Sequence, residues 1–292
     1  MLSLVLVSQL SYIIKMPRGQ DAFTNMAKSK RVQPMNRRNF LKATAITAGV
    51  TVLGGGGLYL GLHDPDILED HFESVEKVLS LRLGNDRATG LMRDIHSEQQ
   101  ALAADMPYIG GNENIFTQWL VYGVYYLAVY RVLKADGRTV ENIGRTVFDA
   151  FRNMADYPGW MLRLIGNLKY NRKYIDTLRR ATLRSQERRF PGDWVATFVE
   201  GDGETFDYGI DITECGIHKL FQKYGAQEFT PYMCLSDFVV SDIFNRGLVR
   251  YKTLAEGSSR CDFRYKKGRP TFVYPLRDGW PPKFKNTHGL AL

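Results

Sequence analysis

The chain has 292 residues, of which 44% are hydrophobic, and a formal net charge of +8. This length allows one large domain or two small ones, and the hydrophobic share is that of an ordinary globular protein. The basic excess lies near the N-terminus and between Arg163 and Arg189, without a zinc-finger spacing, a ribonucleoprotein signature or a recognition-helix pattern. We therefore expect no nucleic-acid partner. Three cysteines are too few for a disulfide scaffold, and their number is odd.

Residues 35–62 have the layout of an export signal. Met35-Asn36-Arg37-Arg38-Asn39-Phe40-Leu41-Lys42 precedes an uncharged stretch from Ala43 to Leu62. The paired arginines resemble a twin-arginine signal. We expect residues 1–63 to be a leader, with translation starting at Met35 as an alternative to Met1. The twin-arginine export machinery is then a partner, and the protein is periplasmic, or anchored on the outer face of the membrane if the signal stays uncleaved.

Residues 64–190 have a helical pattern, with apolar residues recurring at helical spacing. We expect helices from Asp64, over Asp86–Asp105, Ile115–Leu133, Thr139–Met154 and Trp160–Arg188. The segment Ile115–Leu133 is apolar almost all round, which predicts a central core helix. Its tyrosines and polar flanks argue against a membrane span. The basic run in the last segment is either a solvated face or a source of arginines for an acidic substrate.

Residues 191–292 read as strands around two helices, with the boundary at Pro191-Gly192. The expected strands are Trp194–Glu200, Phe206–Thr213, Leu248–Leu254 and Cys261–Tyr265, and the expected helices are Cys215–Tyr224 and Pro231–Phe244. This order predicts an α+β fold, in which a helical N-terminal half precedes an antiparallel sheet with helices on one face.

The three cysteines all lie between Glu214 and Phe263, each beside a second reactive group. Cys215 and His218 are three residues apart on an expected helix, as are Cys234 and Asp237, so each pair shares a face. Cys261 and Asp262 point to opposite faces of a strand, and only one of them can face a site directly. A thiolate is a nucleophile or a soft metal ligand, so this stretch is the candidate site.

Two strings in this stretch resemble the L-2-amino-thiazoline-4-carboxylic acid hydrolase family. They are Pro231-Tyr232-Met233-Cys234-Leu235-Ser236-Asp237 and the hairpin from Leu254-Ala255-Glu256-Gly257 into Cys261-Asp262-Phe263-Arg264-Tyr265. The resemblance extends over 147–267 and is strongest from Glu214 onward. It implies a hydrolase of the class that acts on carbon–nitrogen bonds other than peptide bonds, which opens the thiazoline ring of a small cyclic amidine to an N-carbamoyl cysteine.

Three hypotheses follow. The first is a hydrolase without a cofactor, in which Cys234 attacks a small-molecule substrate, Asp237 or His218 moves protons, and Cys261 and Asp262 complete the site. Candidate substrate-binding residues are Arg260, Arg264 and Tyr232. The second is a zinc protein with Cys215, His218, Cys234 and Cys261 as ligands. The third is a non-catalytic domain that binds a small ligand, with cysteines as core residues or two of them in a disulfide.

Overall fold

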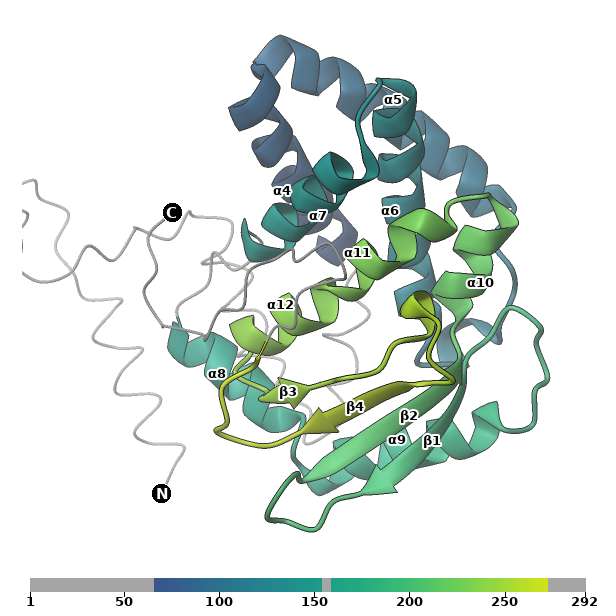
Figure 1. The fold of residues 1–292 in the computed structure, drawn as a ribbon, viewed down its shortest axis with the longest axis vertical. Helices are drawn as coiled ribbons and strands as arrows, with labels where there is room; N and C mark the ends of the chain where they lie inside the picture. The colour runs from purple at the N-terminus through teal and green to yellow at the C-terminus, as the bar shows by residue number, and fades with distance from the viewer. Residues whose placement is uncertain (1–65, 154–158, 273–292) are drawn as a thin grey trace, which may run out of the picture. The chain divides into compact units, whose positions relative to one another are not determined.

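The computed structural model describes residues 66–153 and 159–272 (Figure 1). The leader and its paired arginines lie outside the described residues. The predicted α+β class is confirmed, because helices occupy the first half and an antiparallel sheet with helices occupies the second. The boundary expected at Pro191-Gly192 falls in the loop between the last helix of the first half and the first strand.

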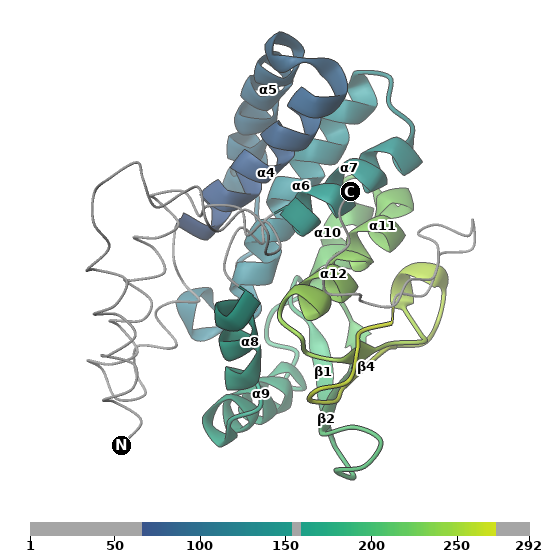
Figure 2. The same cartoon turned by 90° about the vertical axis from the view of Figure 1, so that its left-hand side faces the viewer.

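The first helices of the described chain pack around one buried helix, α6. They are α4 (Asp66–Leu83), α5 (Asn85–Ala104), the short 3₁₀ helix η2 (Gly111–Glu113), α6 (Thr117–Ala135) and α7 (Val140–Asn153). Figure 2 shows α4 and α5 beside α6. Burial on most sides of α6 confirms the predicted core helix. Within 66–153 and 159–272, no helix has the length and apolar character needed to cross a membrane.

The helix expected over Trp160–Arg188 is two helices, so that prediction was wrong. They are α8 (Gly159–Leu168) and α9 (Arg172–Ser185). The break has a local cause, because the Asn171 side chain accepts a hydrogen bond from the Tyr174 amide at 2.8 Å and caps α9. The loop between the helices places the Tyr170 ring against that of Tyr208 in the sheet, with ring centres 5.5 Å apart.

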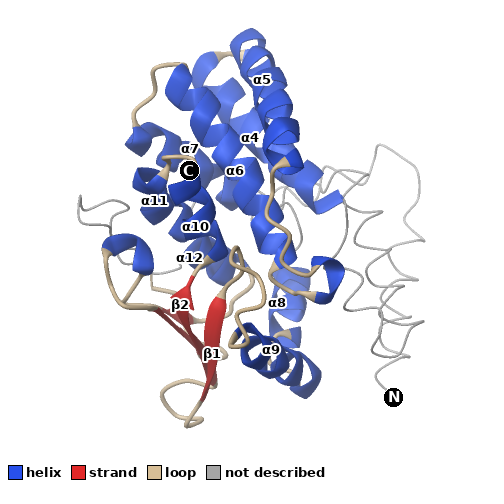
Figure 3. Ribbon diagram, turned by 90° about the vertical axis from the view of Figure 1, so that its right-hand side faces the viewer, coloured by secondary structure: helices blue, strands red, loops and turns tan. Residues whose placement is uncertain are grey.

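The sheet has four strands within the described residues, in the order β1-β2-β4-β3, and all neighbours are antiparallel. They are β1 (Val195–Glu200), β2 (Tyr208–Glu214), β3 (Leu248–Val249) and β4 (Cys261–Tyr265). In β4 the residues Cys261, Phe263 and Tyr265 are buried, whereas Asp262 and Arg264 are half-buried. One face therefore packs under helices, and Figure 3 shows α9 beside β1.

Three helices connect β2 to β3. They are α10 (Gly216–Lys223), α11 (Thr230–Cys234) and α12 (Ser236–Ile243), with the 3₁₀ turn η3 (Gln227–Phe229) before α11. The single helix expected over Pro231–Phe244 is thus broken at Leu235. The Ser236 hydroxyl donates to the Met233 carbonyl at 2.7 Å, a side-chain bond of the kind that competes with helix continuation.

The strand expected over Leu248–Leu254 ends at Val249, which corrects the sequence prediction. Instead of joining the ladder, the amides of Tyr251 and Lys252 donate to Asp262 Oδ1 at 2.9 and 2.6 Å. The chain then forms the 3₁₀ turn η4 (Leu254–Glu256) before β4. This departure from the sheet directs Arg250 and Thr253 toward the cysteines.

Candidate functional site

The three cysteines are brought to one end of the sheet by adjacent elements. Cys215 follows β2 and is the N-cap residue of α10, Cys234 ends α11, and Cys261 opens β4 opposite Ile212 of β2. All three are free thiols. Two of them, Cys234 and Cys261, contact one and the same residue, Thr253.

The hydroxyl of Thr253 links two of the thiols. It donates to Cys234 Sγ at 3.8 Å and lies 3.6 Å from Cys261 Sγ, which donates to it. Cys261 Sγ also accepts the Leu254 amide at 3.3 Å. Sulfur tolerates such long contacts because it is a weak, polarisable hydrogen-bonding atom. We call Cys215, Cys234, Thr253 and Cys261 the thiol cluster.

An ion pair lies against the thiol cluster. Arg250 donates from one amino nitrogen to Asp237 Oδ2 at 2.5 Å and from the other to the Cys234 carbonyl at 2.9 Å. Its guanidinium carbon lies 4.7 and 4.9 Å from the ring centres of Phe238 and Phe263. Arg250 therefore fixes Asp237, at the start of α12, relative to Cys234, at the end of α11.

Burial controls the protonation of this group. It raises the pKa of Cys234 well above the ordinary value, while the charge of Arg250 acts in the opposite direction. Burial likewise raises the pKa of Cys215 to about 12 and raises that of Cys261. The pKa of the Asp237 carboxyl is also raised by burial and lowered by Arg250. At neutral pH the three thiols are therefore protonated, and attack by sulfur requires a base.

The cluster is not sealed from solvent. The Asp237 side chain is 40% exposed, whereas Arg250 and Cys261 are 5% exposed. Cys215 and Cys234 are half-buried. Asp237 therefore forms the exposed side of the site, while Cys261 and Arg250 form its closed side.

His218 lies three residues after Cys215, but its imidazole ring forms no hydrogen bond with the thiol cluster in the described part of the chain. Its Nε2 lies 3.0 Å from Nε2 of Gln222, and its buried Nδ1 has no hydrogen-bond partner among the described residues. Burial lowers the pKa of His218. No hydrogen bond joins this imidazole to a thiol within 66–153 and 159–272. The same residues contain no group of three or more His, Cys, Asp or Glu side chains arranged to hold a metal ion.

Asp262 and the two candidate substrate arginines lie on the other face of the sheet. Asp262 is engaged with the amides of Tyr251 and Lys252 and thus shapes the chain around Arg250. Arg260 and Arg264 both pair with Asp211 of β2, at 3.1 and 2.8 Å. The structure therefore separates these three side chains from the thiols, as the alternation of Cys261 and Asp262 predicts.

Tyr232 packs between two helices. A Cβ built at Gly144 of α7 would lie 2.2 Å from Cδ1 of the Tyr232 ring, so the ring sits directly on the glycine. The contact holds α11 against α7, and with it the position of Cys234 two residues later.

Two residues of the site, Arg250 and Thr253, have no signal in the sequence. Arg250 follows an apolar pair, Leu248-Val249, and looks like an ordinary charge at the end of a strand. Thr253 carries no signal of its own, because its role depends on the chain leaving the sheet after Val249. Neither residue belongs to a spacing pattern that would have identified it.

A cavity of about 290 Å³ lies elsewhere, between α4, α6 and α7. Its lining includes Arg82, Arg138 and Arg145 over an apolar floor, and none of its lining residues belongs to the thiol cluster. Each of these arginines has an acidic partner, namely Asp149, Asp136 and Glu141.

The α+β fold brings thiols, a hydroxyl and a carboxylate together at one end of the sheet. These are side-chain groups that hydrolases use for nucleophilic attack and proton transfer. Residues 121–265 match the family model for L-2-amino-thiazoline-4-carboxylic acid hydrolase, which supports membership of that family. The match includes all three cysteines, Asp237, Arg250 and Thr253. The family name implies hydrolase activity. No curated protein and no solved structure matches the chain.

Proposed function

We propose that the protein hydrolyses a carbon–nitrogen bond in a small cyclic amidine-like or amide substrate, with Cys234 as the nucleophile. The observation that carries this proposal is the contact of the Cys234 sulfur with Thr253, beside the Arg250–Asp237 pair, inside the segment that matches the hydrolase family. The family name supports a cyclic amidine as the substrate class.

The first half of the reaction uses Asp237 as the base. Cys234 loses its proton to the carboxylate, and its sulfur bonds to the electrophilic carbon of the substrate. The raised pKa of Asp237 makes it a better proton acceptor than an ordinary aspartate. The Thr253 hydroxyl, which donates to Sγ, and the positive charge of Arg250 stabilise the developing thiolate.

The second half restores the enzyme. The bond from the attacked carbon to its leaving atom then breaks. The leaving atom is a nitrogen in an amide or amidine, and the ring sulfur in a thiazoline that opens to an N-carbamoyl product. The leaving atom takes the proton from Asp237, so the substrate carbon remains bonded to the Cys234 sulfur. Water then adds to this carbon and gives one proton to Asp237. The bond between this carbon and the Cys234 sulfur breaks, and the Cys234 sulfur takes the proton back. One water is consumed, and no oxidant or reductant is needed.

The test compares turnover in Cys234→Ser and Cys215→Ser, with 2-amino-thiazoline-4-carboxylate and other five-membered cyclic amidines and amides as substrates. We expect Cys234→Ser to lower kcat by on the order of 10³-fold or more, because it removes the attacking atom. Cys215→Ser is the matched control, since Cys215 makes no hydrogen bond to Thr253, and we expect its loss to stay within about tenfold.

Circular dichroism and thermal melting establish that both variants fold. Wild-type turnover in folded Cys234→Ser would contradict the proposal. Elemental analysis of the same samples separates it from the alternative of a zinc protein, for which about one zinc per chain is expected. Binding of a cyclic amidine without turnover by the wild-type protein would favour the non-catalytic alternative.

A further inference from the structure

A second group of side chains, apart from the thiol cluster, combines two cations with aromatic rings. We call it the tyrosine–cation cluster, and its members are Lys169, Tyr170, Tyr174, Tyr208, Arg246 and Tyr265. They come from the α8–α9 connection, α9, β2, the α12–β3 turn and β4. Cys261 and Tyr265 are four residues apart on β4, which separates the two clusters by roughly 13 Å along the strand.

The backbone holds Arg246 in a tight turn. The residues on either side, Asn245 and Gly247, have φ values of 52° and 60°, in the left-handed region. A Cβ at Gly247 would lie 2.1 Å from the Lys266 carbonyl oxygen, so only glycine fits there. The Arg246 carbonyl accepts the hydroxyl of Tyr170. The position of this arginine is therefore fixed by the fold.

The Arg246 guanidinium faces tyrosines. Its Nη2 donates to the Tyr208 hydroxyl at 3.1 Å, and its Cζ lies 4.4 Å from the ring centre of Tyr265. Its Nε is buried and has no hydrogen-bond partner among the described residues. A buried guanidinium donor without an acceptor is costly, and a planar oxyanion is the acceptor that its geometry suits best.

Lys169 adds a second cation to the cluster. Its Nζ lies 4.6 Å from the ring centre of Tyr174, and the rings of Tyr174 and Tyr208 are 6.5 Å apart. Burial and, to a lesser extent, the charge of Arg246 together lower the pKa of Lys169 to about 7. The two cations are thus close enough to disfavour each other's charge.

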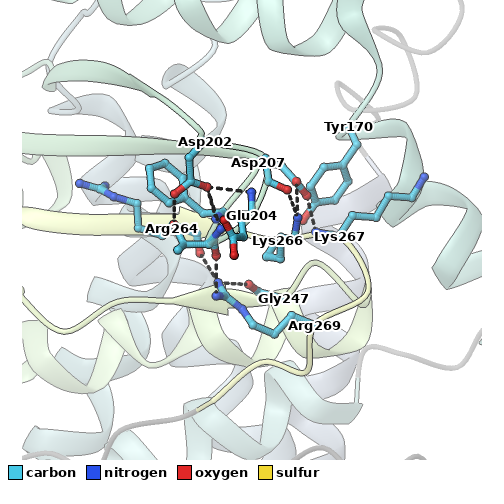
Figure 4. A network of polar contacts seen from close by, with 12 residues as sticks. Tyr170, Asp202, Glu204, Asp207, Gly247, Arg264, Lys266, Lys267 and Arg269 are labelled. Atoms are coloured by element: carbon cyan, nitrogen blue, oxygen red, sulfur yellow. Dashed lines mark hydrogen bonds and ion pairs between the residues drawn. The ribbon is translucent and has the colours of Figure 1, made fainter.

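The described residues do not supply an acid to balance these cations. No ion pair of Lys169 or Arg246 occurs within 66–153 and 159–272. Asp237, which influences Arg246, is bonded to Arg250. Figure 4 shows Asp207, near Tyr170, bonded instead to Lys266 and to the Lys267 amide.

The tyrosines do not balance the cations either. Burial raises the pKa of Tyr265 to about 12, and it raises the pKa values of Tyr170 and Tyr208 as well, so the hydroxyls are neutral. Partly buried positive charge without a counter-charge destabilises a fold, and a bound anion removes that cost.

We propose that Lys169 and Arg246, with the tyrosine rings around them, bind the carboxylate of a small molecule. Three observations support the site: the Arg246 Nε without a partner, the placement of both cations on tyrosine rings, and the absence of an acid paired with either cation in the described part of the chain. The site differs from Arg260 and Arg264, whose charges are already balanced by Asp211.

The experiment is a calorimetric titration of the full chain with benzoate and with benzamide, at constant ionic strength set with sodium chloride. The two probes share a ring and differ in charge. We expect benzoate to bind tighter by on the order of tenfold or more, which is the effect of one charged hydrogen bond. Equal affinities for benzoate and benzamide would overturn the proposal.

Substitutions test whether benzoate binds at the tyrosine–cation cluster. Arg246→Gln and Lys169→Met are each expected to weaken benzoate binding by on the order of tenfold. Arg179→Gln is the matched control, because Arg179 also lies over a ring, that of Phe198 at 4.7 Å, but is paired with Glu200 and Asp176. We expect Arg179→Gln to bind benzoate as the wild type does.

Unchanged affinity in Arg246→Gln and Lys169→Met, or an equal loss in Arg179→Gln, would place benzoate elsewhere and overturn the assignment. If Arg246→Gln fails to fold, Lys169→Met decides alone, because no hydrogen bond to Lys169 Nζ occurs among the described residues. Its side chain is therefore the easier of the two to replace without disturbing the fold.

Discussion

At the scale of single residues, Arg250 is the side chain on which the candidate site depends. It is buried, bonds to both the Asp237 carboxylate and the Cys234 carbonyl, and lies between two phenylalanine rings. A buried arginine is tolerated only with such partners. It connects the base of the proposed reaction to the element that carries the nucleophile.

We predict that Arg250→Met lowers the free energy of unfolding by about 1–3 kcal/mol, measured by urea denaturation. This is less than the cost of breaking a fully buried pair, because the Asp237 side chain is 40% exposed. Arg260→Met is the control: the Arg260 side chain is 39% exposed, against 5% for Arg250, and we expect a loss below about 1 kcal/mol.

Adding Asp237→Asn to Arg250→Met should cost less than the sum of the two single losses, because the unpaired charge is then removed as well. Additive losses would show that Arg250 and Asp237 are not coupled, and Arg250 would then stabilise the site by packing against Phe238 and Phe263 alone.

At the scale of elements, the contact of α7 with α11 positions Cys234. Gly144 leaves room for the Tyr232 ring, and no larger residue does so without displacing that ring. We predict that Gly144→Ala destabilises the protein by about 1–3 kcal/mol, the usual cost of overpacking a core. Thermal melting or urea denaturation measures the effect.

Gly90, inside α5, provides the matched control. A Cβ there meets nothing within 4 Å, so Gly90→Ala should stabilise the protein by about 0.5–1 kcal/mol through helix propensity. Equal effects of the two substitutions would show that Tyr232 does not rest on Gly144 in solution.

The elements themselves were largely predictable from the sequence. Apolar periodicity and turn residues are local signals, and they located the helices of the first half, the hairpin of β1 and β2, α10 and β4. The misses are the breaks between α8 and α9 and between α11 and α12, and the short β3. They depend on particular hydrogen bonds, from the Asn171 cap, the Ser236 hydroxyl and the Asp262 carboxylate.

The site was predictable only in part, because it too depends on particular hydrogen bonds and not on local sequence patterns alone. The gathering of cysteines in one stretch of sequence indicated that the thiols would meet, and Cys234 and Cys261 both contact Thr253. Arg250 and Thr253 reach them because the chain leaves the sheet after Val249, which no periodicity encodes. The tyrosine–cation cluster draws on residues from 169 to 265, and its members meet only in the folded chain.

At the scale of the whole molecule, one hydrophobic core joins the helices to the sheet. Tyr130 of α6 stacks on Phe229, with ring centres 5.1 Å apart, and its hydroxyl donates to Glu228 at 2.7 Å. The helices of the first half thus support α10 to α12, which carry Cys234 and Asp237. A change in the helical half is therefore expected to reach the site through packing.

We propose that the protein is exported through the twin-arginine route, on the basis of Arg37-Arg38 and the uncharged stretch after them, which lie outside the described residues. Replacing both arginines with lysine should retain the protein in the cytoplasm, as measured by cell fractionation. Export at the wild-type level in that variant would contradict the proposal.

The most direct measurement is the mass of the protein during turnover. Acid quenching of a reaction with a slow cyclic amidine, followed by peptide mass spectrometry, reports which side chain bonds to the substrate carbon. We predict a transient adduct on the peptide that contains Cys234, and none on that peptide in Cys234→Ser. Steady turnover with Cys234 unmodified, or an adduct on a different residue, would contradict the central claim.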